Sequence, residues 1–257
     1  EELGRVYAAD LLMQCSLGLA GQALATLEPP PGSARWTEWA LAANADYEAN
    51  HAAPEVAPMD MAVVMKTVQR LAPADTVYTN GAGNFSAWLH RYTRYHGLQH
   101  HGRTQLAPTS GAMGYGVPAS IAAKVAYPER TVVCFAGDGD FQMNCQELAS
   151  AKQAGAQPII LILNNGIYGT IRAHQERHYP ERVSGTSMVN PDFAALAMAY
   201  GFHGERVSRT EDFPAAFARA LASKTGAVLD LDISPEALTP RQTLSQMRAA
   251  ALAKKGQ

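Results

Sequence analysis

The chain has 257 residues, of which 47% are apolar, and this is enough for the core of one large α/β domain or of one domain with an appendage. Its 21 basic and 23 acidic residues give a formal net charge of −2, which argues against a nucleic-acid partner or an anionic membrane surface. No apolar stretch approaches the roughly 18 residues that span a bilayer, and no signal peptide is evident.

The cysteines and the first residue bear on where the protein works and on how complete the chain is. Cys15, Cys134 and Cys145 are scattered along the sequence, so we expect free thiols and a reducing cytoplasm rather than a disulfide framework. The chain begins with Glu1 and not with Met. We therefore expect a piece of a longer protein or a processed subunit.

Two breaks interrupt the first part of the chain. The segment EPPPGS at 28–33 is the first, and Pro54 with Pro58 forms the second. The main domain is therefore expected over residues 57–257. The elements expected before it are a short strand over 4–12, a helix over 17–27 and a helix over 36–51.

Strands and helices are expected to alternate through the main domain. The expected strands cover 76–79, 131–136, 158–163, 201–207 and 227–233. The expected helices cover 59–71 with Asp60 as its cap, 85–95, 110–125, 141–154, 191–200, 211–223 and 241–254. This alternation predicts an α/β fold, a doubly wound parallel sheet with helices on both faces.

Two of these strands end in polar residues that suit a metal. The strand over 131–136 runs into Gly137-Asp138-Gly139, and the strand over 158–163 runs into Asn164-Asn165. Open α/β sheets bind ligands at the carboxyl ends of their strands, and carboxylate and amide oxygens suit Mg²⁺. Two ordinary turns are the simpler alternative, but both clusters follow a buried strand directly and only one helix separates them. The pattern predicts a divalent metal that holds a diphosphate at a helix start.

GDG, a helix, and then a strand that ends in NN form the motif of thiamine diphosphate (ThDP) enzymes. The segments SGAMGYGVPASIAAK, VVCFAGDGDFQMNCQELASAKQAG and PIILILNNGIYGTIRAHQ resemble the C-terminal, diphosphate-binding domain of the acetolactate-synthase-like enzymes. The resemblance covers about 56–235, and it implies that residues 1–56 are the end of a preceding middle domain plus a linker. It also implies C–C bond making or breaking on 2-oxoacids or aldehydes by a decarboxylase, carboligase or lyase.

The resemblance implies a role for each candidate site residue. Asp138, the side chain of Asn165 and the carbonyl of Ile167 would bind Mg²⁺. Met113 would fill the gap between the two rings of the bent cofactor, and the carbonyl of Gly111 would accept a hydrogen bond from its 4′-amino group, so these two are the expected catalytic residues. Further cofactor contacts are expected from Asn84, Phe85, Gly137, Gly139, Asp140, Tyr168 and Gly169. The side chain of Asp140 is expected to be a helix N-terminal charge rather than a second metal ligand.

Two departures from the family pattern concern the substrate and the partner. Typical acetolactate synthases carry Met and Trp where this chain has Thr170 and His174, which predicts a more open acceptor side of the site. No segment in 1–57 resembles the pyrimidine-binding domain that supplies the family's activating glutamate. That domain is expected from another chain or from a missing N-terminal part, with a homo-oligomer as the assembly. FAD in a longer protein stays possible but is not indicated.

Three alternatives stay open at this point. The histidines of HGLQHHGR (96–103) fit a solvated loop, or a loop at the mouth of the site with one His on the substrate, better than a zinc site, because two glycines interrupt them. The segment NGAGNF (80–85) matches a dinucleotide-binding fingerprint only in part, which disfavours a dehydrogenase. A non-catalytic, cofactor-binding subunit that needs a partner chain is the third alternative.

Overall fold

The computed structural model describes residues 3–32, 36–94 and 104–255, and the chain divides into two compact units, Glu1–Ala49 and Asn50–Gln257. The first unit contains α1 (Leu17–Ala25) and α2 (Thr37–Ala49), and no residue of either helix is buried. Ser16 caps α1, because its hydroxyl accepts a hydrogen bond from the Leu19 N–H at 3.3 Å. The prediction of a strand over 4–12 is wrong, since the described part of this unit contains no second strand with which it could pair.

The second unit is built on a six-stranded parallel sheet with strand order β2-β1-β3-β4-β6-β5. The strands are β1 (Val77–Asn80), β2 (Gln105–Leu106), β3 (Val132–Gly137), β4 (Ile159–Asn164), β5 (His203–Val207) and β6 (Ala227–Asp232). This sheet confirms the predicted doubly wound fold. Every residue of β3 is buried, because helices cover both faces of the sheet, and this explains why the strand reads as one apolar run. The two-residue strand β2 was not predicted, since it is too short to show a period.

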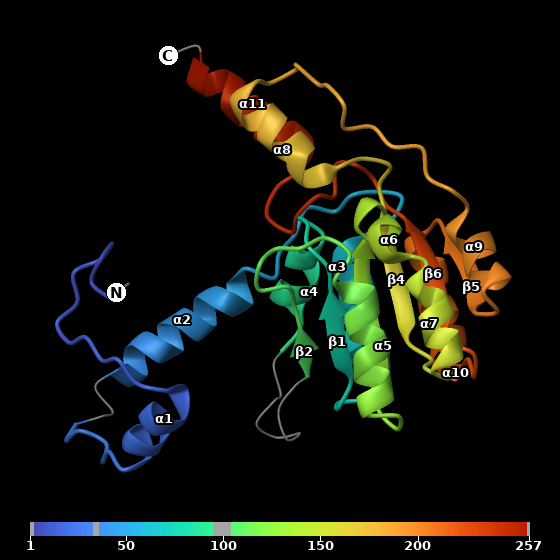
Figure 1. The fold of residues 1–257 in the computed structure, drawn as a ribbon. Coiled ribbons are helices and arrows are strands. Elements are labelled where there is room, and N and C mark those ends of the chain that lie inside the picture. The colour runs from blue at the N-terminus through green and yellow to red at the C-terminus, as the bar shows by residue number, and fades with distance from the viewer. Residues whose placement is uncertain (1–2, 33–35, 95–103, 256–257) are drawn as a thin grey trace. The chain divides into compact units, whose positions relative to one another are not determined.

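Helices lie on both faces of the sheet (Figure 1). These are α3 (Met61–Leu71), α4 (Ser86–Tyr92), α5 (Gly116–Ala126), α6 (Asp138–Asn144), α7 (Glu147–Gln153), α9 (Phe193–Ala199) and α10 (Phe213–Ala222), with a 3₁₀ turn at Thr210–Asp212. Helices α8 (Gly169–His178) and α11 (Leu244–Lys255) instead pack on each other, away from the sheet faces. Helices α3, α4 and α10 share one apolar core with β3, β4 and β6, and α5, α6, α7 and α9 share the other. Asp60 caps α3 as predicted, and its Oδ1 accepts from the Ala62 N–H at 2.8 Å.

Two expected helices have different bounds, and both differences lie beside the candidate site. The helix expected from residue 110 begins only at Gly116, because Gly111 and Gly114 have φ angles of 69° and 82° that a right-handed helix does not accept. The helix expected over 141–154 is two helices. The first, α6, already begins at Asp138 and ends at Asn144, whose side chain bonds to another loop.

The second unit begins at Asn50, and residues before the expected start at 57 pack onto α4. The Tyr92 hydroxyl donates to the His51 carbonyl at 2.8 Å, and Arg91 donates to the carbonyl of Asn50 at 2.9 Å. The expected helix over 85–95 ends at Tyr92 in the structure. The three histidines of 96–103 lie outside the described residues. None of the described helices has the length and apolar character that crossing a membrane requires.

Candidate functional site

A cleft with a volume of about 260 Å³ opens at the carboxyl ends of β1, β3 and β4. Every residue predicted to bind the cofactor or the metal lines it: Asn84, Phe85, Gly111, Met113, Gly137, Asp138, Gly139, Asp140, Asn165, Ile167, Tyr168 and Gly169. One wall was not predicted, and it consists of Ile233, Ala237 and Leu238 in the segment that follows β6. The structure therefore brings the predicted residues together at the edge of the sheet where the fold places ligands.

Asp138 is the first residue of α6 and is only 3% exposed. Its Oδ1 accepts from the Gly139 N–H at 2.9 Å, and its Oδ2 accepts from the Gly166 N–H and from the Asn190 amide, both at 2.8 Å. Burial raises the pKa of this carboxyl, and the hydrogen bonds partly oppose that rise. These three partners are all neutral donors, so a bound cation would offset the cost of burying the carboxylate.

Asn165 shapes the loop that follows β4. Its Oδ1 accepts from the Ile167 N–H at 3.1 Å, and the intervening Gly166 has a φ of 67° that glycine adopts without strain. The segment Thr186–Met188 holds this loop from outside, through the bonds Tyr168 N–H to Thr186 carbonyl at 2.9 Å and Met188 N–H to Gly166 carbonyl at 2.8 Å. The oxygen of Asn165 is therefore presented on a fixed turn.

A chain of amides lies beneath Asp138, and sequence reasoning missed it. Asn190 donates one Nδ2 to Asp138 and also to the Oδ1 of Asn164, each at 2.8 Å. Asn164 in turn donates to the buried carboxylate of Asp230 at 3.0 Å. The two residues of the NN pair thus do different work, since Asn165 lines the cleft and Asn164 supports it. Successive side chains of a strand point to opposite faces, and this could have shown from the sequence that Asn164 and Asn165 have different roles. Nothing in the spacing of the sequence indicated a role for Asn190.

Asp140 lies in the first turn of α6, the helix position that was predicted for it, and it is 2% exposed. Its Oδ1 accepts from the Ala82 N–H at 3.0 Å and from the Gly114 N–H at 2.8 Å, so it ties two other loops to α6. A Cβ on Gly81 would lie 2.0 Å from this oxygen, which only glycine avoids. Burial raises the pKa of the Asp140 carboxyl to about 6, against the effect of its two N–H bonds.

Asn84 supplies the best evidence that the cleft fits an anion. Its Nδ2 is buried and has no hydrogen-bond partner in the described part of the chain, although buried donors are nearly always paired. Its backbone N–H is engaged, because it donates to the Thr170 hydroxyl at 3.0 Å. The expected donors Gly139 and Tyr168 also use their N–H groups within the chain, so a diphosphate would share or replace those bonds. The Asn84 side-chain amide is therefore available to donate a hydrogen bond to a bound anion.

Aromatic and apolar side chains complete the walls. The Phe85 ring packs on two glycines, since a Cβ on Gly83 or Gly137 would lie 2.7–2.8 Å from its ring atoms. Met113 is 40% exposed and lines the cleft. Thr170 also lines it, whereas His174 is exposed on α8 and is not among the lining residues. The two departures from the family pattern therefore differ in position, and only Thr170 borders the cleft.

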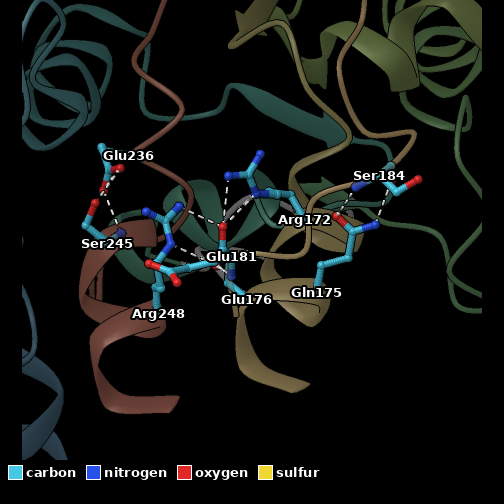
Figure 2. Close-up of polar contacts among 8 residues, drawn as sticks. All are labelled: Arg172, Gln175, Glu176, Glu181, Ser184, Glu236, Ser245 and Arg248. Carbon is cyan, nitrogen blue, oxygen red and sulfur yellow. Dashed lines mark hydrogen bonds and ion pairs between the residues drawn. The ribbon is translucent and has the colours of Figure 1, made fainter. Parts of the chain in front are cut away.

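The segment after β6, which forms one wall of the cleft, leads into α11. Helix α11 packs on α8, and a cluster of ion pairs joins the two helices (Figure 2). Glu176 of α8 is fully buried and accepts two bonds from Arg248 of α11, at 2.7 and 2.8 Å, and one from Arg172 at 2.9 Å. Arg248 above all holds the pKa of Glu176 at about 2. Leu238 packs on the start of α8, because a Cβ on Gly169 would lie 2.7 Å from it.

Comparison with known proteins identifies the family. The model "Thiamine pyrophosphate enzyme, C-terminal TPP binding domain" matches residues 81–231, which include all the residues proposed to bind the cofactor and the metal. The chain belongs to this family. Thiamine pyrophosphate is another name for ThDP, so the match agrees with the resemblance seen in the sequence. It also removes the dehydrogenase alternative, since residues 81–85 of the segment NGAGNF lie within the matched domain.

The relatives include acetolactate synthases of bacteria and yeast. The chain is 36% identical to the isozyme 2 large subunit of Escherichia coli over 175 residues, which is 66% of this chain and 31% of that protein. It is 32% identical to the large subunit of Parasynechococcus marenigrum over 239 residues, or 90% of this chain and 38% of that protein. It is 42% identical to the mitochondrial catalytic subunit of Saccharomyces cerevisiae over 123 residues, or 48% and 18%. The chain thus spans less than two fifths of the relatives it matches.

Proposed function

We propose that this chain supplies the diphosphate- and Mg²⁺-binding half of the active site of a ThDP-dependent enzyme that makes or breaks C–C bonds on 2-oxoacids. The observation that carries the proposal is the pairing of Asp138 and Asn165 at the ends of adjacent strands, in a cleft lined by every predicted site residue. Among the described residues no three His, Cys, Asp or Glu side chains gather as a metal cage. One carboxylate with neutral oxygens suits Mg²⁺, which shares its remaining ligand positions with phosphate and water.

Each group in the cleft has a task in this proposal. Asp138, the Asn165 side chain and the Ile167 carbonyl hold Mg²⁺, and the unpaired amide of Asn84 donates to the diphosphate. The N–H groups of Asp140 and Gly169, in the first turns of α6 and α8, add donors that their helices leave free. When bound, the cofactor supplies a nucleophilic carbon that adds to the substrate carbonyl.

Met113 and Gly111 are the proposed catalytic residues because both border the cleft that the metal residues also line. The thioether of Met113 supports the bent cofactor, and an unbranched side chain of this kind fills an irregular gap well. The Gly111 carbonyl accepts from the 4′-amino group and so holds its proton in place. The φ of 69° at Gly111 leaves the backbone facing open space, where a Cβ would meet no atom within 4 Å.

The rest of the active site comes from a pyrimidine-binding domain with the activating glutamate, in another chain of a homo-oligomer or in another part of a longer protein. The chain alone is then catalytically silent. A decarboxylase or carboligase of the acetolactate-synthase type is the class supported by the relatives' names. A reducing compartment such as the cytoplasm agrees with three free cysteines. A non-catalytic cofactor-binding subunit is the alternative, and an assay of the complete assembly separates the two.

Titration calorimetry with ThDP tests the proposal. We expect binding with Mg²⁺ present and little or none with EDTA, because a carboxylate and a diphosphate repel each other unless a cation lies between them. Asp138→Asn should abolish the Mg²⁺-dependent binding, whereas Asp212→Asn, the same change at an exposed ion pair, should leave it intact. Equal ThDP affinity with Mg²⁺ and with EDTA would refute the proposal.

A further inference from the structure

The short helix α6 holds both backbone polar groups of one residue in the loop before α5. Asp140 accepts a hydrogen bond from the Gly114 N–H at 2.8 Å. Asn144, one turn further along the same helix, donates its amide to the Gly114 carbonyl at 2.9 Å. One peptide segment is therefore fixed from both sides by side chains that start from a single rigid element.

Gly114 directly follows Met113, so these two bonds fix the backbone from which the Met113 side chain reaches the cleft. Methionine has three rotatable bonds, and a fixed backbone limits where its thioether can lie. The other end of α6 carries Asp138. A helix of seven residues therefore links the metal-binding carboxylate to the loop that carries Met113.

The close packing around these bonds depends on glycine at two positions. Gly114 has a φ of 82°, and a Cβ there would lie 2.8 Å from the Asn144 Nδ2 and from the Met143 Cβ. A Cβ on Gly81 would lie about 2 Å from both Asp140 oxygens. The loops come this near to α6 only because neither glycine has a side chain.

We propose that Asp140 and Asn144 are positioning residues that hold Met113, through Gly114, in register with the metal site at Asp138. The inference rests on the proposed function, in which Met113 supports the rings of ThDP and Asp138 binds the metal on its diphosphate. Neither residue needs to touch the reacting atoms. They keep Met113 at the distance from Asp138 that one cofactor requires, with its rings at Met113 and its diphosphate at Asp138.

Two probes separate this role from general support of the cleft. Mg²⁺-ThDP uses both ends of the site, whereas Mg²⁺ with inorganic pyrophosphate uses only the metal end. For Asn144→Ala we expect ThDP to bind about tenfold more weakly and pyrophosphate to change by about twofold or less, since a lost hydrogen bond of this kind costs up to about one factor of ten. Calorimetry on the purified protein measures both dissociation constants, and Gln153→Ala, which removes an exposed amide from α7, is the matched control.

Asp140 offers a second test, because the loss of its charge and the loss of its hydrogen bonds should change ThDP affinity in opposite directions. Asp140→Ala removes a negative charge near the diphosphate, which by itself would tighten the binding of both anions. A selective loss of ThDP affinity must then come from the loop. Asp140→Asn should restore ThDP binding, because its Oδ1 can still accept from Ala82 and Gly114.

The last step asks whether both residues act through Met113. Met113→Ala should itself weaken ThDP selectively, and Asn144→Ala added to it should cost little more, because coupled residues are not additive. If the parent protein binds neither probe, the proposed function fails. If the parent binds both and Asn144→Ala weakens both equally, or weakens neither, the positioning role is overturned. Additive losses in the double variant would overturn it as well.

Discussion

Asn190 donates one side-chain amide to Asp138 and to Asn164 at the same distance, 2.8 Å. The donor lies in the segment before α9, far along the sequence from both acceptors. It connects the metal-binding carboxylate to the end of β4, and through Asn164 to the buried carboxylate of Asp230. The orientation of Asp138 is therefore set jointly by three segments of the chain.

Loss of this donor should weaken metal binding. For Asn190→Ala we expect the Mg²⁺ affinity, measured by titration at saturating ThDP, to fall about 10-fold, in the lower part of the range for residues that orient metal ligands. Gln142→Ala, which removes only an exposed donor to the far side of Asn190, should have a smaller effect. An unchanged Mg²⁺ affinity in Asn190→Ala would show that the backbone alone orients Asp138.

Glu176 should make the free energy of unfolding depend on pH. Its pKa is lowered from 4.5 to about 2 in the folded chain, chiefly by Arg248, so its contribution is complete above about pH 4.5 and is lost as the pH falls toward 2. The contribution is on the order of 2–3 kcal/mol. Urea unfolding at pH 7, 4 and 3 should show a difference between wild type and Glu176→Gln that shrinks with falling pH.

Glu236→Gln is the matched comparison for that series. Glu236 accepts bonds from the N–H and the hydroxyl of Ser245 on α11 (Figure 2). It is only partly buried, whereas Glu176 is fully buried. Replacement of Glu236 should cost less than about 1 kcal/mol, because the bonds are solvent-exposed and the Gln side chain keeps one oxygen that can still accept from Ser245. Equal losses for the two glutamates at pH 7 would contradict a special role for the buried ion pairs.

Gly81 should be intolerant of a side chain only while Asp140 is present. Gly81→Ala is expected to lower the free energy of unfolding by about 1–3 kcal/mol, the usual cost of overpacking. In an Asp140→Ala background most of that cost should vanish, because the clashing atoms are gone. Gly18→Ala, whose Cβ would meet nothing within 4 Å, is the control. An undiminished cost in the double variant would place the clash elsewhere.

Acceptor choice should be broad in the complete enzyme. Thr170 lines the cleft, and its hydroxyl accepts a hydrogen bond from the Asn84 N–H. The resemblance seen in the sequence implies a larger Met at this position of the family. We expect no marked preference for 2-oxobutyrate over pyruvate as acceptor. Competition between the two, resolved by product chromatography, gives the ratio, and a strong 2-oxobutyrate preference would refute the expectation.

The chain alone should not accelerate exchange of the ThDP C2 proton. Without the activating glutamate, acid–base assistance worth roughly 10²–10⁴ in rate is missing. NMR in deuterated buffer measures this exchange in the presence of Mg²⁺ and the purified chain. A rate clearly above that of free ThDP would mean that a residue of this chain supplies the base.

The sheet and the residues around the cleft could be predicted because their signals are local. Buried strands read as apolar runs, and the polar clusters follow them directly, so Asp138 and Asn165 could be found from spacing alone. Asn190 and Leu238 could not, because their roles arise from contacts between segments that are far apart in the sequence. The break between α6 and α7 was hidden for the same reason, since the Asn144 amide donates to Gly114, which lies 30 residues away in the sequence. A strand at 4–12 was expected from composition, which does not report whether a partner strand exists.

The ion pairs between α8 and α11 make the last helix part of the cofactor's surroundings. The first residues of α8 border the cleft, and its other half is joined to the last helix through Glu176 and Arg248. A truncation that starts at Leu244 would leave Glu176 with Arg172 as its remaining ion-pair partner and would remove the apolar cover of Met247. Affinity tags and fusion partners are therefore better attached away from α11. A fusion directly after this helix can disturb its packing on α8, which supports the thiamine diphosphate cleft.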